Sequence, residues 1–129
     1  MKKINTNRFR MIDRIKSLGY AIVGIRTFFK TQHNAWIHLF SAVIVLIAGI
    51  LMKVNLNEWC WLLVSIGLVF ITEMINTAVE FLTDLASPQI HPLAKKVKDV
   101  SAAAVLIAAV TSAIIGLIIF VPKFLKFDL

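Results

Sequence analysis

The sequence predicts an all-α membrane protein, in which an N-terminal amphipathic surface helix precedes three transmembrane helices. The first observation is composition: 59% of the 129 residues are hydrophobic, and the mean hydropathy of +0.83 is too high for a soluble domain of this length. The second is charge, since the net charge of +7 comes from lysines and arginines that flank the apolar runs. Anionic lipid explains this placement better than nucleic acid does. We therefore expect residues 1–129 to form a single membrane-embedded domain.

The first element is a predicted surface helix over about residues 8–30. Apolar side chains recur along it at spacings of three and four residues, with Arg14, Lys16 and Thr27 between them. A helix of this kind lies in the membrane interface with its apolar face in the lipid. The same pattern would suit a simple membrane anchor, so it does not by itself indicate a function.

Three apolar runs are long enough to cross a hydrocarbon core roughly 30 Å thick. They cover about residues 35–52, 59–85 and 100–121. Because proline cannot continue a helix, Pro88 and Pro92 predict a loop over residues 87–97. The distribution of basic residues places the N-terminus and the 86–98 loop on the cytoplasmic side.

The second span carries a polar face. At about 100° per residue, five of its polar side chains fall within an arc of roughly 100°. They are Glu73, Asn76, Thr77, Glu80 and Asp84. With Trp59 at one interface, Glu73 lies about 21 Å further along, inside the far leaflet, and Glu80 about 31 Å along, at its water boundary. An acid at such a depth costs up to about 3 kcal/mol and indicates a functional site.

Two structural alternatives compete with a functional site on this face. It could be a polar seam between helices of an oligomer, or a solvated helix end, which suits Asp84 better than Glu73. An oligomer that conducts ions or protons would also use the acids. His38, near the start of the first span, is expected to hydrogen-bond at the interface.

A second group of charges, Lys98 and Asp99, lies at the mouth of the third span, at the same predicted boundary as Glu80. Carboxylate oxygens can hold Mg²⁺, a lysine can neutralise phosphate charge, and a buried glutamate can accept the proton of a hydroxyl. The sequence contains no glycine-rich phosphate loop. From these residues alone, phosphoryl transfer to a lipid and a proton or ion path fit nearly equally well.

The polar motifs together resemble those of the prokaryotic diacylglycerol kinase and undecaprenol kinase family. They read Glu73-x-x-Asn76-Thr77-Ala78-x-Glu80-x-x-x-Asp84 and Lys98-Asp99-x-x-Ala102-Ala103-x-Val105, within a resemblance that covers roughly residues 9–121. The resemblance implies a homotrimer in the bacterial cytoplasmic membrane, with active sites shared between chains on the cytoplasmic side. It implies direct transfer of the γ-phosphate of MgATP to a lipid hydroxyl, with diacylglycerol as the leading acceptor and undecaprenol as the alternative.

The resemblance also implies roles for single residues. Glu73 is expected to take the proton of the lipid hydroxyl, and Glu80 to bind Mg²⁺. Gln32 stands where the family commonly has a glutamate as a second metal ligand, and its amide oxygen can coordinate a metal without contributing charge. The other expected nucleotide-site residues are Tyr20, Asn76, His91, Lys98 and Asp99.

Overall fold

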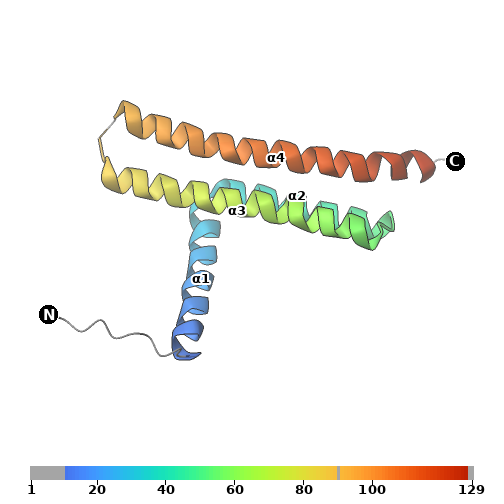
Figure 1. The fold of residues 1–129 in the computed structure, drawn as a ribbon, viewed down its shortest axis with the longest axis horizontal. Coiled ribbons are helices and arrows are strands. Elements are labelled where there is room, and N and C mark those ends of the chain that lie inside the picture. Colours follow the sequence, from blue (N-terminus) through green and yellow to red (C-terminus); the bar gives the residue numbers. More distant parts are fainter. Residues whose placement is uncertain (1–10, 90, 128–129) are drawn as a thin grey trace.

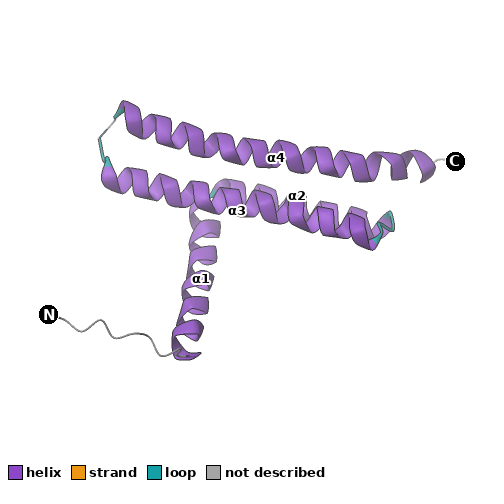
Figure 2. Cartoon of the chain, in the orientation of Figure 1, coloured by secondary structure: helices purple, strands orange, loops and turns teal. Residues whose placement is uncertain are grey.

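The structure is a computed structural model that describes residues 11–89 and 91–127. Within these residues it contains the helices α1 (Met11–Thr31), α2 (His33–Leu51), α3 (Leu56–Ala86) and α4 (Pro92–Phe127). The described chain is otherwise made of short turns (Figure 2), which confirms the predicted all-α class. The predicted start of the surface helix, over residues 8–10, lies outside the described residues.

The helices form a bundle with one outlier. α2, α3 and α4 run side by side, and α1 projects away from them (Figure 1). Each of the three bundled helices is long and apolar enough to cross a membrane. A helix that leaves such a bundle sideways is placed to lie along the membrane surface, as its amphipathic sequence predicts.

The α3–α4 turn lies beyond the point where α1 meets α2 (Figure 1). Gln32, which separates α1 from α2, contacts Glu80 of α3. From Glu80 the helix continues to Ala86, about 9 Å further at 1.5 Å per residue. The last turns of α3 and the first turns of α4 therefore project past the level of the surface helix.

The connection between these helices is shorter than predicted, and the expected loop over residues 87–97 is wrong. α4 begins at Pro92, because proline is well suited to the first position of a helix, where its missing N–H would have no partner in any case. The ring Nδ1 of His91 accepts a hydrogen bond from the backbone N of Leu93 at 3.1 Å and so caps the helix. Lys98 and Asp99 consequently lie on α4 itself.

At its other end α4 extends beyond the predicted span of about residues 100–121, because the helix continues through Pro122 to Phe127. A proline inside a helix removes one backbone hydrogen bond and usually bends or ends the helix. Here the segment beyond it is tied to α3, since Lys123 Nζ lies 2.9 Å from Glu58 Oε2.

The turn between α2 and α3 is closed by hydrogen bonds. Asn55 accepts from the backbone N of Glu58 at 3.0 Å, and Glu58 accepts from the backbone N of Asn55 at 2.7 Å, which is a capping box. The end of α2 is closed by a bond of 3.0 Å from Val54 N to Gly49 O, with Lys53 in the left-handed region at φ 51°. This arrangement is a Schellman motif.

Apolar packing follows directly on this turn. A buried cluster joins Val54, Leu62 and Ile119, and the ring of Trp59 lies against Gly49, where a Cβ would come within 2.6 Å of it. We call this region, residues 49–62 with the facing residues 119–123 of α4, the capped end of the bundle. The opposite region, Gln32 with residues 73–84 and 95–101, is called the polar end.

Candidate active site

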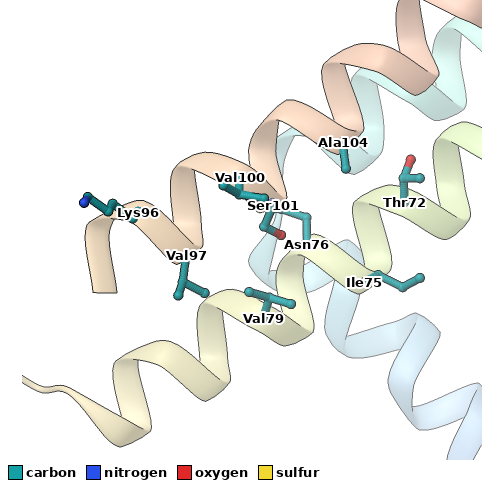
Figure 3. Close-up of a pocket in the computed structure, with 9 residues that line it drawn as sticks. All are labelled: Thr72, Ile75, Asn76, Val79, Lys96, Val97, Val100, Ser101 and Ala104. Carbon is teal, nitrogen blue, oxygen red and sulfur yellow. The ribbon is translucent and has the colours of Figure 1, made fainter. Parts of the chain in front are cut away.

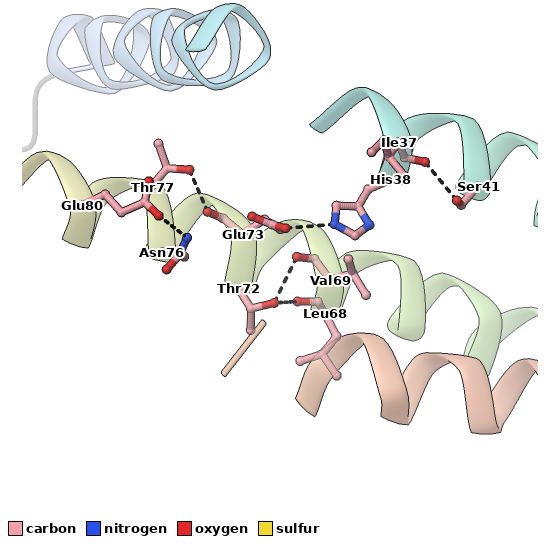
Figure 4. A network of polar contacts seen from close by, with 10 residues as sticks. All are labelled: Ile37, His38, Ser41, Leu68, Val69, Thr72, Glu73, Asn76, Thr77 and Glu80. Atoms are coloured by element: carbon pink, nitrogen blue, oxygen red, sulfur yellow. Dashed lines mark hydrogen bonds and ion pairs between the residues drawn. The ribbon is translucent and has the colours of Figure 1, made fainter. Parts of the chain in front are cut away.

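The deepest acid of the polar end is Glu73, whose exposed fraction is 4%. Its Oε1 lies 2.9 Å from Nε2 of His38 on α2 (Figure 4). A carboxylate has no proton to give, so the ring N–H donates to it. The ring of His38 also meets Phe70 edge to face, with centroids 6.5 Å apart. His38 is therefore more than the interfacial residue predicted from the sequence: it is the hydrogen-bonding partner of Glu73.

Glu80 lies two turns further along α3, about 10 Å from Glu73 along the helix axis. Its Oε1 accepts a hydrogen bond of 3.0 Å from Asn76 Nδ2, and its Oε2 accepts one of 3.4 Å from Gln32 Nε2. The structure thus brings together three residues that the sequence assigned to the metal and nucleotide site. Glu73 and Glu80 lie on the same side of α3 (Figure 4), as the helical period predicts.

The same residues offer oxygen ligands to a cation. Asn76 Oδ1 is buried and has no hydrogen-bond partner in the described part of the chain, which is unusual for a buried amide oxygen. Three or more His, Cys, Asp or Glu side chains do not gather anywhere among the described residues. Mg²⁺ is commonly held by one or two carboxylates together with substrate phosphates. The carboxylate of Glu80 fits that pattern of binding, and the amides of Asn76 and Gln32, whose N–H groups face Glu80 here, would add oxygen ligands after rotation of each amide.

The charged residues of α4 pair with Asp84 and with each other. Lys98 Nζ lies 2.5 Å from Asp84 Oδ1, one turn beyond Glu80, and Asp99 pairs with Lys95 of its own helix at 2.5 Å. Within the described chain neither Lys98 nor Asp99 contacts Glu80. Lys98 of α4 therefore meets α3 at Asp84, and not at Glu73 or Glu80.

The two remaining predicted nucleotide contacts lie on the surface. The side chain of Tyr20, on α1, is 75% exposed and has no hydrogen bond within the described residues. His91 is exposed and serves as the cap of α4. Their contact with a nucleotide remains a prediction.

A cavity of about 590 Å³ opens between α3 and α4 beside Asn76 (Figure 3). Its walls are mostly aliphatic, with Asn76 from α3 and Ser101 from α4 among the few polar residues. A second cavity, of about 530 Å³, lies between α2, α3 and α4 and has His38 in its lining. The first cavity therefore lies beside a buried polar side chain of the polar end, whereas the second runs along the middle of the bundle and reaches Leu62 and Phe120 of the capped end.

These features define a class of protein: a three-span membrane protein with a buried carboxylate and a second cluster of oxygen ligands near one membrane surface. Comparison with known sequences identifies the family. The model of the family described as prokaryotic diacylglycerol kinase matches residues 19–120. The chain belongs to this family, and it is accordingly a lipid kinase of the bacterial membrane that uses ATP.

Individual relatives differ in their named acceptor. The undecaprenol kinase of Bacillus subtilis is 43% identical over 117 residues, which cover 91% of each chain. The diacylglycerol kinase of Synechocystis is 39% identical over 85% of this chain and 63% of its own. The diacylglycerol kinase of Escherichia coli K12 is 33% identical over 85% of this chain and 88% of its own.

Sequence reasoning missed the contact between His38 and Glu73, although a signal for it was present. His38 is the only titratable residue in residues 35–52, and a glutamate buried in an apolar span requires a partner. The depth also agrees, because His38 follows Gln32 by six residues and Glu73 precedes Glu80 by seven. Gln32 and Glu80 are themselves in contact.

Proposed function

We propose that the polar end transfers the γ-phosphate of ATP directly to the primary hydroxyl of a membrane lipid. The observation that carries the proposal is the pair of acids on one side of α3, one buried at 4% exposure among the spans and the other half-buried where α1 meets the bundle. A lipid hydroxyl reaches the first from the membrane. A nucleotide reaches the second from the water.

Glu73 acts as the general base in this proposal. Its carboxylate accepts the proton of the lipid hydroxyl while the bond from the lipid oxygen to the γ-phosphorus forms. The bond from the γ-phosphorus to the bridging oxygen breaks, and ADP leaves with the electron pair. Most of the catalysis in such a transfer comes from positioning and charge stabilisation, so a single base held rigidly at the correct depth is sufficient.

The nucleotide is held by the groups nearer the α3–α4 turn. Glu80, Asn76 and Gln32 would bind Mg²⁺, which neutralises phosphate charge when bound. Lys98 and Asp99 engage the phosphates and the rest of the nucleotide. Tyr20 and His91 provide further contacts. Electrostatic attraction of a lysine to phosphate supports the role of Lys98.

The site is proposed to be completed by another copy of the chain in a homotrimer. Within one chain Lys98 pairs with Asp84 and does not contact Glu80, and Asn76 Oδ1 is buried without a partner among the described residues. A neighbouring chain that brings its own α4 to the face of Glu80 would supply a lysine beside Glu80 and a polar partner for Asn76 Oδ1. The basic residues near the N-terminus and the α3–α4 turn support a cytoplasmic position for this site.

For the acceptor we propose undecaprenol first and diacylglycerol second. The relative named undecaprenol kinase matches 91% of both chains at 43% identity, and the diacylglycerol kinases match at 39% and 33%. This reverses the order expected from the sequence motifs, which are common to both activities.

The test uses the purified full chain in mixed micelles with radiolabelled ATP and either lipid, at matched mole fractions. We expect a labelled lipid phosphate, a sequential kinetic pattern and a higher kcat/KM with undecaprenol. A higher kcat/KM with diacylglycerol would make diacylglycerol the preferred acceptor and undecaprenol the second. Absence of any labelled lipid with both would overturn the proposed reaction.

A further inference from the structure

His38 is the one partner that the described chain provides for the buried carboxylate of Glu73. It extends from the second turn of α2, and its Nε2 lies 2.9 Å from Glu73 Oε1. The other oxygen, Oε2, has no hydrogen-bond partner among the described residues. The two oxygens of one carboxylate are thus in different situations, one held and one free.

We propose that His38 is a positioning residue for the phosphoryl transfer: by holding Oε1 it turns Oε2 of Glu73 toward the acceptor hydroxyl. This inference rests on the proposed function, because it gives Glu73 the role of the base. His38 forms and breaks no covalent bond in it and gives up no proton. The acceptor proton moves to Oε2, while His38 keeps its N–H on Oε1.

A positioning residue is needed here because the glutamate side chain is long and its surroundings offer few competing contacts. α4 carries no charged residue between Val100 and Val121, so it provides no ion pair to orient the acid. Thr77, one turn further along α3, donates to the backbone oxygen of Glu73 at 2.9 Å and leaves the carboxylate alone. Without His38 the carboxylate could adopt several rotamers.

The ring of His38 is itself held in place, which a positioning role requires. Its side chain is 22% exposed, and the edge-to-face contact with Phe70 fixes the ring plane from the same helix that carries Glu73. Phe70 in turn lies 6.3 Å, centroid to centroid, from Phe29 near the end of α1. The orientation of the base is therefore linked to the junction of the surface helix with the bundle.

The test compares three variants of His38 in the full chain, by steady-state kinetics in mixed micelles with both ATP and acceptor varied. His38→Leu removes the donor. His38→Gln carries an amide N–H that can take the place of Nε2, whereas His38→Asn is one methylene shorter and cannot reach it. His33→Leu is the matched control, because His33 is exposed in the first turn of the same helix.

We expect His38→Leu to lower kcat by roughly 100-fold, the loss typical of a misplaced reacting group, with the KM for ATP within about twofold of wild type. His38→Gln should recover most of the loss, and His38→Asn should resemble His38→Leu. In the Glu73→Gln background, His38→Leu should have no further effect, since the two residues act as a unit. His33→Leu should match wild type.

Wild-type kcat in His38→Leu, or equal activity of His38→Asn and His38→Gln, would overturn the positioning role. A loss confined to the KM for ATP would do the same, because it would assign His38 to nucleotide binding. If His38→Leu does not fold, the comparison of His38→Gln with His38→Asn tests the positioning role, because only His38→Gln should be active. An inactive Glu73→Gln beside a fully active His38→Leu removes only this inference, whereas a fully active Glu73→Gln removes the proposed base itself.

Discussion

The two ends of α3 lie in the same helix and use their polar residues in opposite ways. At the capped end Asn55 and Glu58 bond to each other's backbone, and Trp59 covers Gly49. At the polar end Asn76 Oδ1 is buried without a partner among the described residues, beside a cavity of about 590 Å³. Satisfied hydrogen bonds stabilise a fold, whereas a buried polar atom without a partner beside a cavity is available to a ligand. The comparison assigns stability to one end and chemistry to the other.

After loss of the proposed base Glu73, the largest expected effect comes from neutralising Glu80. Glu80→Gln removes the one carboxylate near Asn76 and Gln32, so charge on the transferring phosphate is less well compensated. We expect kcat/KM for ATP to fall by roughly 100- to 1,000-fold, with little change in the unfolding midpoint. Initial rates over a range of ATP and Mg²⁺ concentrations measure the loss.

The control for this prediction is Glu58→Gln at the capped end of the same helix. It weakens the capping box and the contact with Lys123, so it should lower the thermal midpoint in detergent and leave the initial rate near that of wild type. Equal losses of activity in the two variants would abolish the distinction between the ends.

The second prediction concerns packing at the capped end. In Gly49→Ala the new Cβ meets the ring of Trp59 at 2.6 Å, and overpacking of this kind destabilises by about 1–3 kcal/mol. Gly67→Ala is the matched control, because a Cβ there meets nothing within 4 Å, so the higher helix propensity of alanine should stabilise by up to about 1 kcal/mol. Thermal unfolding of both variants in the same detergent checks the sign of each change.

A third prediction compares lysines at the two ends. Lys98→Met removes the charge proposed to meet phosphate and should raise the KM for ATP roughly tenfold with kcat nearly unchanged. Lys123→Met breaks the contact with Glu58 and should lower the unfolding midpoint only. If Lys98→Met changed stability and left the KM unaltered, its ion pair with Asp84 would be its whole function.

The smallest effect is expected at Gln32, which is proposed to contribute an oxygen ligand to Mg²⁺. Gln32→Glu adds a carboxylate beside Glu80, which should lower the Mg²⁺ concentration for half-maximal activity by roughly three- to tenfold. A Mg²⁺ titration at saturating ATP measures it, with Thr31→Glu as a control for added charge at the α1–α2 junction. An unchanged titration would remove Gln32 from the set of metal ligands.

Much of the fold followed from the sequence because it depends on single helices. Apolar run length predicted the spans, and helical periodicity placed Glu73, Asn76 and Glu80 on one side of α3. The start of α4 could not be predicted in this way, because a proline in the sequence can either break a helix or occupy its first position. The capping hydrogen bond of His91, which distinguishes the two cases, is visible only in the structure.

The contact between Glu73 and His38 does not follow from periodicity, for a different reason. Periodicity tells which residues share a face of one helix, but it leaves open how a neighbouring helix is rotated about its own axis. In this bundle close packing contributes to that rotation, including the contact of Trp59 with Gly49 at the far end of α2.

Glu73 is proposed to take the proton of the lipid hydroxyl, and its replacement by glutamine tests this role. Purified wild type and Glu73→Gln are compared for transfer of labelled γ-phosphate from ATP to undecaprenol and to diacylglycerol in the same micelles. Loss of a general base predicts a fall in kcat of roughly 100- to 10,000-fold, with the KM for ATP and the elution volume of the protein unchanged. Wild-type transfer to either lipid by Glu73→Gln would contradict the account.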